Sequence, residues 1–216
     1  MIVFGSSVSP FVRKVLVFGA EKGIELEHKP IGLGATDPDF LEASPFRKIP
    51  GLQDGDFKIC DSSAIVHYLE AKYPEPALIP AEPRARARTI WYDEFADTIL
   101  MACGAKMFFN RVVAPRFLGR PGDLAIADKA EAEELPPILD YLERVAPERG
   151  GFLVGDAITL ADIAVAAPFA NFGYMDVAID AGRYPRLEAY VAAMLARPSF
   201  APWLERDRAF LAKAAA

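Results

Sequence analysis

The fold of this chain is decided near its start, where the apolar run Met1-Ile2-Val3-Phe4 is followed closely by Ser9-Pro10-Phe11-Val12. The first run predicts a short buried strand. Apolar residues then recur at helical spacing from Val12 to Phe18, and proline suits the first helical turn. Ser9 would be the N-cap, beside backbone N–H groups without helical partners and at the positive end of the helix dipole. This position suits a plain helix cap or a bound anion, and the segment by itself favours the cap.

Composition narrows the classes of partner. The 216 residues carry a formal net charge of −6 and contain no Lys/Arg cluster, which excludes a nucleic-acid footprint. Cys60 and Cys103 have neither disulfide nor metal-site spacing, so we expect both to be buried in a reducing compartment. The only histidines, His28 and His67, exclude a multi-histidine metal site, and we expect no metal.

The sequence predicts neither a signal peptide nor a membrane-spanning segment. The first apolar run has no positively charged region before it, and Asp162, Pro168 and Asn171 interrupt the longest apolar stretch. We therefore expect a cytoplasmic protein without a membrane partner.

Two units with different patterns follow one another. Up to about Tyr73 the order is strand, helix, strand, short helix, a hairpin turning at Asp54-Gly55, and a helix from Ser62. Four prolines between residues 73 and 83 then exclude a regular element. We predict an α/β domain at residues 1–75, a linker at 76–84 and an all-helical domain at 85–216.

The second unit reads as helical throughout. Runs cover Ala85–Val113 and Leu124–Val145, and further helices begin at Thr159, near Tyr184 and after Phe200. Thr159-Leu160-Ala161-Asp162 has the pattern of a capping box, which is structural and carries no catalysis.

Two further motifs suit a bound peptide. Ile49-Pro50 precedes a strand, where a cis bond would turn the backbone of Ile49 toward an extended peptide, although base rates favour trans. Asp61-Ser62 begins the helix after the hairpin, and a helix start of this kind can hold a carboxylate or simply be capped.

As an ordered set these motifs resemble the cytosolic glutathione S-transferase family, serine-type and bacterial-like, over essentially the whole chain. Lys48-Ile49-Pro50 is similar to the family's cis-proline strand, and Asp61-Ser62-Ser63-Ala64-Ile65 to its acidic-Ser-x-Ala-Ile helix start. The resemblance implies a thioredoxin-like glutathione-binding domain followed by a helical bundle. It also implies a homodimer that acts in detoxification by joining glutathione to a small hydrophobic electrophile. A glutathione-dependent isomerase or dehalogenase, or a non-catalytic binding module, remain alternatives.

The resemblance also assigns residues. Ser9 stands where related proteins carry a nucleophilic cysteine, so its hydroxyl would hydrogen-bond the glutathione thiolate; Ser7 is a second candidate and Ser6 a third. The implied glutathione-binding residues are Ser9, Phe11, Lys48, Ile49, Pro50, Asp61 and Ser62. Among them, Ile49 would offer its backbone, Lys48 would reach the glycyl carboxylate, and Ser62 with Asp61 would meet the γ-glutamyl end. The electrophile pocket would lie between the first long helix and the chain end, with candidates Met101, Met107, Phe108, Phe109 and Arg111.

Overall fold

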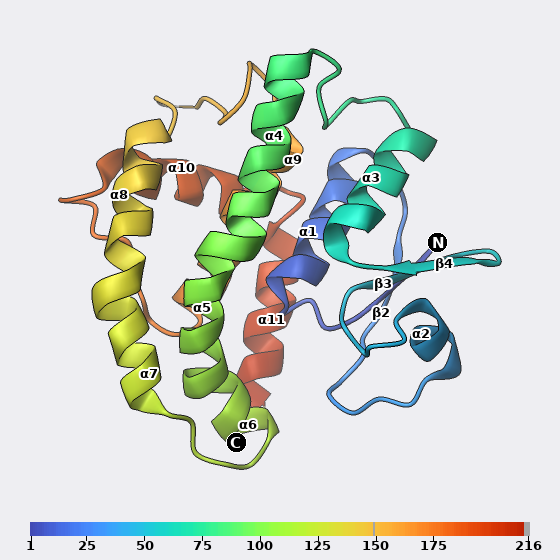
Figure 1. The fold of residues 1–216 in the computed structure, drawn as a ribbon, viewed down its shortest axis with the longest axis horizontal. Helices are drawn as coiled ribbons and strands as arrows, with labels where there is room; N and C mark the ends of the chain where they lie inside the picture. Colours follow the sequence, from blue (N-terminus) through green and yellow to red (C-terminus); the bar gives the residue numbers. More distant parts are fainter. Residues whose placement is uncertain (149, 214–216) are drawn as a thin grey trace.

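The computed structural model describes residues 1–148 and 150–213 and joins a small α/β unit to a larger helical one (Figure 1). The α/β unit consists of β1 Ile2–Phe4, α1 Pro10–Glu21, β2 Glu27–Lys29, α2 Pro38–Ala43, β3 Gly51–Asp54, β4 Phe57–Cys60 and α3 Ser62–Lys72. Its sheet has the order β2-β1-β3-β4, with β1 parallel to β2 and antiparallel to β3. This is the predicted thioredoxin-like order of elements.

The hairpin turn lies one residue later than predicted. Asp54 pairs with Phe57, so the two-residue loop is Gly55-Asp56, and Gly55 takes a φ of 63°. A two-residue hairpin loop requires positive φ at its first position, which glycine adopts without a steric penalty. The Asp-Gly pair therefore marked the hairpin, but its glycine opens the loop where we expected it to close the turn.

The helical unit begins with one long rod. Helices α4 Pro83–Phe95, α5 Met101–Phe108 and α6 Ala114–Phe117 follow each other without a break, joined by the π-helical turns Ala96–Leu100 and Phe109–Val113. A second rod contains α7 Leu124–Lys129, the π-helical turn Ala130–Glu134 and α8 Leu135–Val145. The remaining helices are α9 Leu160–Gly173, α10 Pro185–Leu195 and α11 Ala201–Lys213. The predicted helical runs are confirmed.

Helix α9 is the centre of the core. All of its residues from Leu160 to Phe172 are buried, and it packs against both α1 and α4. The predicted capping box is present at its start, where the Asp162 carboxylate accepts a hydrogen bond from the Thr159 backbone N–H at 2.9 Å. Because α9 contacts α1, the core of the helical unit continues into the α/β unit.

Between α3 and α4 no helix or strand forms over residues 73–82, which are all described. Glu70 of α3 holds this segment through the backbone N–H groups of Leu78 and Ile79, both at 3.1 Å. The predicted domain limits are compatible with this break and stay a prediction.

Cys60 and the Ile49-Pro50 bond both differ from what was expected of them from the residues alone. Cys103 is buried as expected, but Cys60 at the end of β4 is only half-buried, because that strand lies at the edge of the sheet. The Ile49-Pro50 bond is cis, against the base rate.

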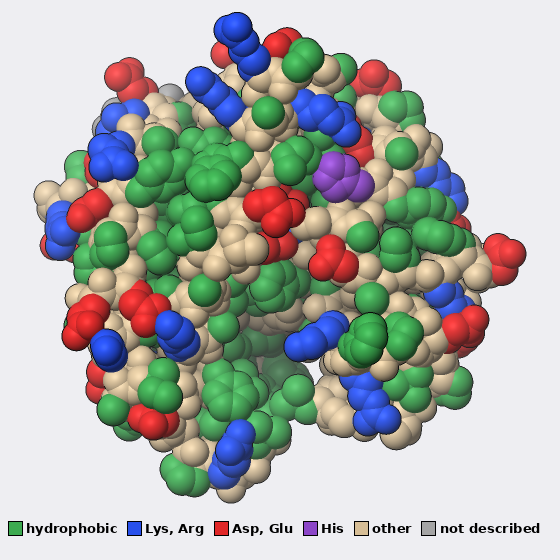
Figure 2. All heavy atoms as spheres, viewed as in Figure 1, with side chains coloured by type: hydrophobic (Ala, Val, Ile, Leu, Met, Phe, Trp, Pro, Cys, Tyr) green, Lys and Arg blue, Asp and Glu red, His purple; other side chains and the backbone are tan. Residues whose placement is uncertain are grey.

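Among the described residues, no helix is long and apolar enough to cross a membrane. Acidic and basic side chains are scattered over the visible face, which is hollowed between the α5–α6 side and the α/β unit (Figure 2).

Candidate active site

The loop between β1 and α1 comes very close to the Ile49-Pro50 segment, and Gly5 is the residue that permits this. Gly5 has a φ of 138°, and a Cβ added to it would stand 2.6 Å from Val12 Cγ2 and 3.0 Å from Ile49 Cβ. A side chain at this position would therefore push apart the Val12 side chain at the start of α1 and the side chain of Ile49. The loop residues that follow, from Ser6 to Ser9, enter α1 in a path fixed by this contact.

Ser9 occupies the N-cap position of α1 as predicted, yet its hydroxyl does not cap. Its φ and ψ are −69° and 126°, and its side chain makes no cap hydrogen bond. The helical ladder begins with the Arg13 N–H donating to Ser9 O at 2.9 Å. The N–H groups of Phe11 and Val12 precede that bond and lack helical partners, and Pro10 has none to offer. The half-exposed Ser9 hydroxyl and the N–H groups of Phe11 and Val12 thus lie together at the positive end of the helix dipole.

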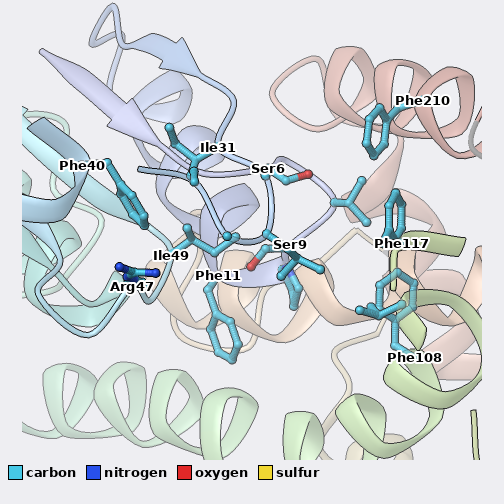
Figure 3. Close-up of a pocket in the computed structure, with 17 residues that line it drawn as sticks. Ser6, Ser9, Phe11, Ile31, Phe40, Arg47, Ile49, Phe108, Phe117 and Phe210 are labelled. Carbon is cyan, nitrogen blue, oxygen red and sulfur yellow. The ribbon is translucent and has the colours of Figure 1, made fainter. Parts of the chain in front are cut away.

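A cavity of about 310 Å³ opens at this helix start (Figure 3). One wall comes from the α/β unit and the other from α5, α6 and α11 of the helical unit. It is lined by Ser6, Val8, Ser9, Pro10, Phe11, residues 31–35, Phe40, Arg47, Ile49, Phe108, Val113, Phe117 and Phe210. In Figure 3 Ser9 lies between the two walls, with Arg47 and Ile49 on one side and Phe108 and Phe117 on the other. The lining is mostly apolar, with one charged residue and the two serines.

The three candidate serines differ in where they point. Ser6 and Ser9 line the cavity. Ser7 does not: it is buried, and its hydroxyl donates to Asp207 Oδ1 of α11 at 2.6 Å. A hydroxyl already committed to a buried carboxylate has no proton left to donate to a ligand. The geometry therefore favours Ser9 over Ser7.

The expected glutathione-binding residues fall into two groups. Ile49 and Phe11 line the cavity beside Ser9, and the cis Pro50 is buried next to Ile49. Lys48 is exposed and is not among the lining residues. Its neighbour Arg47 lines the cavity instead, with a φ of 56° that is uncommon for a residue other than glycine. Sequence reasoning missed Arg47, because the family resemblance pointed to Lys48 and no local pattern predicts the left-handed backbone at Arg47.

Asp61 and Ser62 lie outside the cavity lining, at the start of α3. The Asp61 carboxylate caps its own helix through the backbone N–H groups of Ser63 and Ala64, both at 3.0 Å. Ser62 is buried, and its hydroxyl donates to Asp97 Oδ2 at 3.4 Å. The structure does not bring this pair into the same cavity as Ser9.

Asp97 belongs to a buried charged cluster that joins α1, α3 and the long rod that begins with α4. Lys14 of α1 donates to Asp93 at 2.6 Å and to Asp97 at 2.7 Å, and Ser63 donates to Asp93 at 2.8 Å. Burial raises the pKa of Asp97, against the opposing effect of the Lys14 ammonium.

Of the residues proposed for the electrophile pocket, only Phe108 lines the cavity. Met101 and Met107 are buried in the core, which corrects their assignment, since methionines at helical spacing pack inward here. Arg111 is turned away and pairs with Asp128 at 2.7 Å and Glu131 at 2.5 Å. Phe109 is exposed, beneath the guanidinium of Arg120.

On the wall that the helical unit provides, sequence reasoning missed Val113, Phe117 and Phe210. The Phe117 and Phe210 rings stack with centroids 5.6 Å apart and planes 10° apart. The expected place, between the first long helix and the chain end, is where these rings lie, but periodicity alone does not show which aromatic faces the cavity.

Neither cysteine offers an alternative nucleophile in this cavity. Burial raises the pKa of the Cys103 thiol to about 11, so the thiol stays protonated at neutral pH, and Cys60 is not among the lining residues. Any thiolate chemistry at Ser9 must use the sulfur of a bound molecule.

Comparisons of the sequence and of the structure with known proteins agree with each other. Residues 3–77 match the glutathione S-transferase N-terminal domain and residues 122–207 the C-terminal domain. Glutathione S-transferase 3 of Zea mays is 34% identical over 212 residues, which cover 92% of this chain and 90% of that protein. Glutathione S-transferase theta-1 of Homo sapiens is 32% identical over 202 residues, covering 91% and 78%. The crystal structure of glutathione transferase F7 from Populus trichocarpa superposes with a TM-score of 0.82 at 27% identity, covering 94% and 97%.

Proposed function

The chain belongs to the glutathione S-transferase family and is a glutathione transferase, and from that premise we propose which residues carry out the transfer. Ser9 donates its hydroxyl proton in a hydrogen bond to the sulfur of bound glutathione. The observation that carries this assignment is the Ser9 hydroxyl itself, which faces the cavity and makes no cap bond at a helix start with two free N–H donors.

These groups favour the ionised form of the thiol. A free thiol has a pKa of about 8.5, and a helix N-terminus with a hydrogen-bond donor lowers it toward neutrality. The glutathione thiol releases its proton to solvent, and the thiolate lone pair attacks the electrophilic carbon. In a substitution, the new S–C bond forms while the leaving group departs with the electrons of the bond that breaks. In an addition, the π electrons of the attacked double bond move onto the conjugated acceptor group, which then takes a proton from solvent.

The glutathione backbone would pair with Ile49, and we propose Arg47 for the glycyl carboxylate in place of Lys48. Arg47 is the basic side chain that borders the cavity, and guanidinium binds carboxylate in a bidentate manner. Because Arg47 is exposed, solvent screens this contact, so Arg47→Ala should raise KM for glutathione by about two- to fivefold. Lys48→Ala is the matched neighbour, and an equal rise in both variants would refute the assignment.

The opposite wall would hold the electrophile. Phe108, Phe117 and Phe210 give that side an aromatic surface without a charged group, which supports a small hydrophobic co-substrate.

Loss of the thiolate in Ser9→Ala tests the central assignment. The ultraviolet absorbance of the thiolate in the glutathione complex should fall at neutral pH, and kcat should drop about 10²-fold, as for other lost donors to a developing anion. Ser6→Ala is the control, because Ser6 borders the same cavity. A thiolate band that survives in Ser9→Ala and vanishes in Ser6→Ala would move the role to Ser6.

We further propose a homodimer that acts in cytoplasmic detoxification. Several large apolar side chains are exposed, among them Phe46 at 84%, Phe57 on β4, and Trp91 and Ile99 on the long rod. Figure 2 shows hydrophobic side chains gathered on the α4 side, and a second copy covering part of this surface would bury them. Sedimentation equilibrium should give twice the chain mass; a monomer at micromolar concentration would contradict the proposal. The unpaired cysteines support a reducing compartment.

A further inference from the structure

The loop that leads to Ser9 rests on one face of helix α11. Trp203, Asp207 and Leu211 are four residues apart and therefore share that face. The Trp203 ring meets His28 edge-on at 5.2 Å, and His28 Nε2–H donates to Gly5 O at 2.7 Å. Leu211 packs in a small apolar cluster with Val8. Helix α11 thus reaches both ends of the loop, although about 200 residues separate the helix from the loop in the sequence.

Asp207 is the central contact of this face. It is fully buried and accepts three hydrogen bonds: from Ser7 Oγ at 2.6 Å, from the Arg13 guanidinium at 2.8 Å and from the Tyr174 hydroxyl at 3.1 Å. Ser7 belongs to the loop, Arg13 to the second turn of α1, and Tyr174 to the end of α9. One carboxylate therefore joins the loop and the helix that follows Ser9 to the helical unit.

The loop carbonyl next to Ser9 is held in the same way. Val8 O accepts a hydrogen bond from Asn171 Nδ2 at 2.9 Å. Arg13 orients Asn171 by donating to its Oδ1 at 2.9 Å, and also donates to Ala167 O at 2.8 Å. Arg13 is wholly buried, so its guanidinium needs the Asp207 charge beside it. Removing Asp207 would disturb Arg13, Asn171 and Val8 together.

We propose that Asp207 is a positioning residue for the transfer reaction: by holding Ser7 and Arg13 it sets the direction in which Ser9 and the first turn of α1 face the cavity. Phe210 lies one helical turn beyond Asp207 and lines the same cavity. Helix α11 therefore aligns the thiol-activating loop with the electrophile wall. This inference rests on the proposed role of Ser9.

The alternative is that Asp207 only fastens the two units together, and α1 provides a matched control at its other end. There Glu21 accepts from Arg197 through two bonds of 2.8 Å, and Ser199 donates to the same carboxylate. Both sites combine a carboxylate, an arginine and a serine across the same interface. Only the Asp207 site touches the loop of Ser9.

The test compares Ser7→Ala with Ser199→Ala, each of which removes one hydroxyl from one of these carboxylates. We measure the apparent pKa of the bound glutathione thiol from its thiolate absorbance, together with kcat and KM. Ser7→Ala should raise that pKa measurably and lower kcat about tenfold or more, since small misplacements at a reacting centre cost up to about 10²-fold. KM for glutathione should change little. Ser199→Ala should lose comparable stability and keep the wild-type thiol pKa.

Asp207→Asn and Glu21→Gln form a second pair that preserves side-chain volume. If Asp207→Asn does not fold, the serine pair decides the question. Equal thiol pKa values in Ser7→Ala, Ser199→Ala and the wild-type protein would overturn the inference, while loss of the band in Ser9→Ala would leave the proposed function standing. A band that persists in Ser9→Ala but disappears in Ser7→Ala would overturn both and make Ser7 the catalytic group.

Discussion

Replacing Gly5 by alanine tests how closely the loop must approach Ile49 for the site to form. A Cβ at this position would lie 2.6 Å from Val12 Cγ2, well inside the ~3.5 Å at which carbon atoms pack without repulsion. Overpacking of this kind costs about 1–3 kcal/mol. The φ of 138° is nearly closed to alanine and costs about 1–3 kcal/mol more. The smaller unfolded-state entropy of alanine returns about 0.4–1 kcal/mol.

The net expectation is a loss of about 2–5 kcal/mol in the free energy of unfolding. Gly23→Ala separates the two contributions, because Gly23 also has a positive φ, of 67°, but nothing lies within 4 Å of an added Cβ. That φ is the ordinary left-handed region, which costs about 1–2 kcal/mol, so the net loss should stay near 1 kcal/mol.

Urea denaturation followed by circular dichroism measures both variants, with thermal melting as a second probe. Folded Gly5→Ala protein should also bind glutathione more weakly, because the added methyl group displaces Ile49. A Gly5→Ala variant that is no less stable than Gly23→Ala would refute the reasoning, since it would mean that the loop and Ile49 can separate freely.

Three further outcomes are expected. Burial raises the pKa of Glu21, but hydrogen bonds from Arg197 and a neighbouring serine outweigh it and hold the pKa below the usual 4.5. The ionised form of Glu21 therefore stabilises the fold above about pH 4.5, and this contribution is lost as the pH falls below that value. In Glu21→Gln the urea concentration at the unfolding midpoint should therefore fall less steeply at acid pH than in the wild-type protein. Phe210→Ala removes a ring stacked on Phe117 and should raise KM for an aromatic electrophile about two- to tenfold, with KM for glutathione unchanged. Asp162→Ala leaves buried donors without an acceptor and should lower unfolding free energy by roughly 3 kcal/mol or more, measured by urea denaturation, while kcat of the folded protein is retained.

Much of the fold could be predicted because the relevant signals are local. The apolar run before Ser9 and the Thr159–Asp162 capping box each act within a few residues, and the structure has both. The predicted hairpin turn was wrong by one residue because Asp54-Gly55 and Gly55-Asp56 are both acceptable turn pairs. The register of β3 against β4, in which Asp54 pairs with Phe57, selects the second.

The candidate site was less predictable. Met107 and Phe108 are neighbours on one helix, yet only the second reaches the cavity, because the direction of a helix face depends on what packs against it. Arg47 was missed for its left-handed backbone, and Phe210 for its distance along the chain.

The sequence by itself determined the order of strands and helices, the strand-to-helix turn at Ser9 and the family that these patterns resemble. Only the tertiary structure decided which hydroxyl is free to serve a ligand. Ser7 and Ser9 are two residues apart and chemically alike, but Ser7 is held by Asp207, 200 residues away, and Ser9 faces the cavity. Local periodicity carries no information about such a contact, because it forms only when α11 packs against the loop.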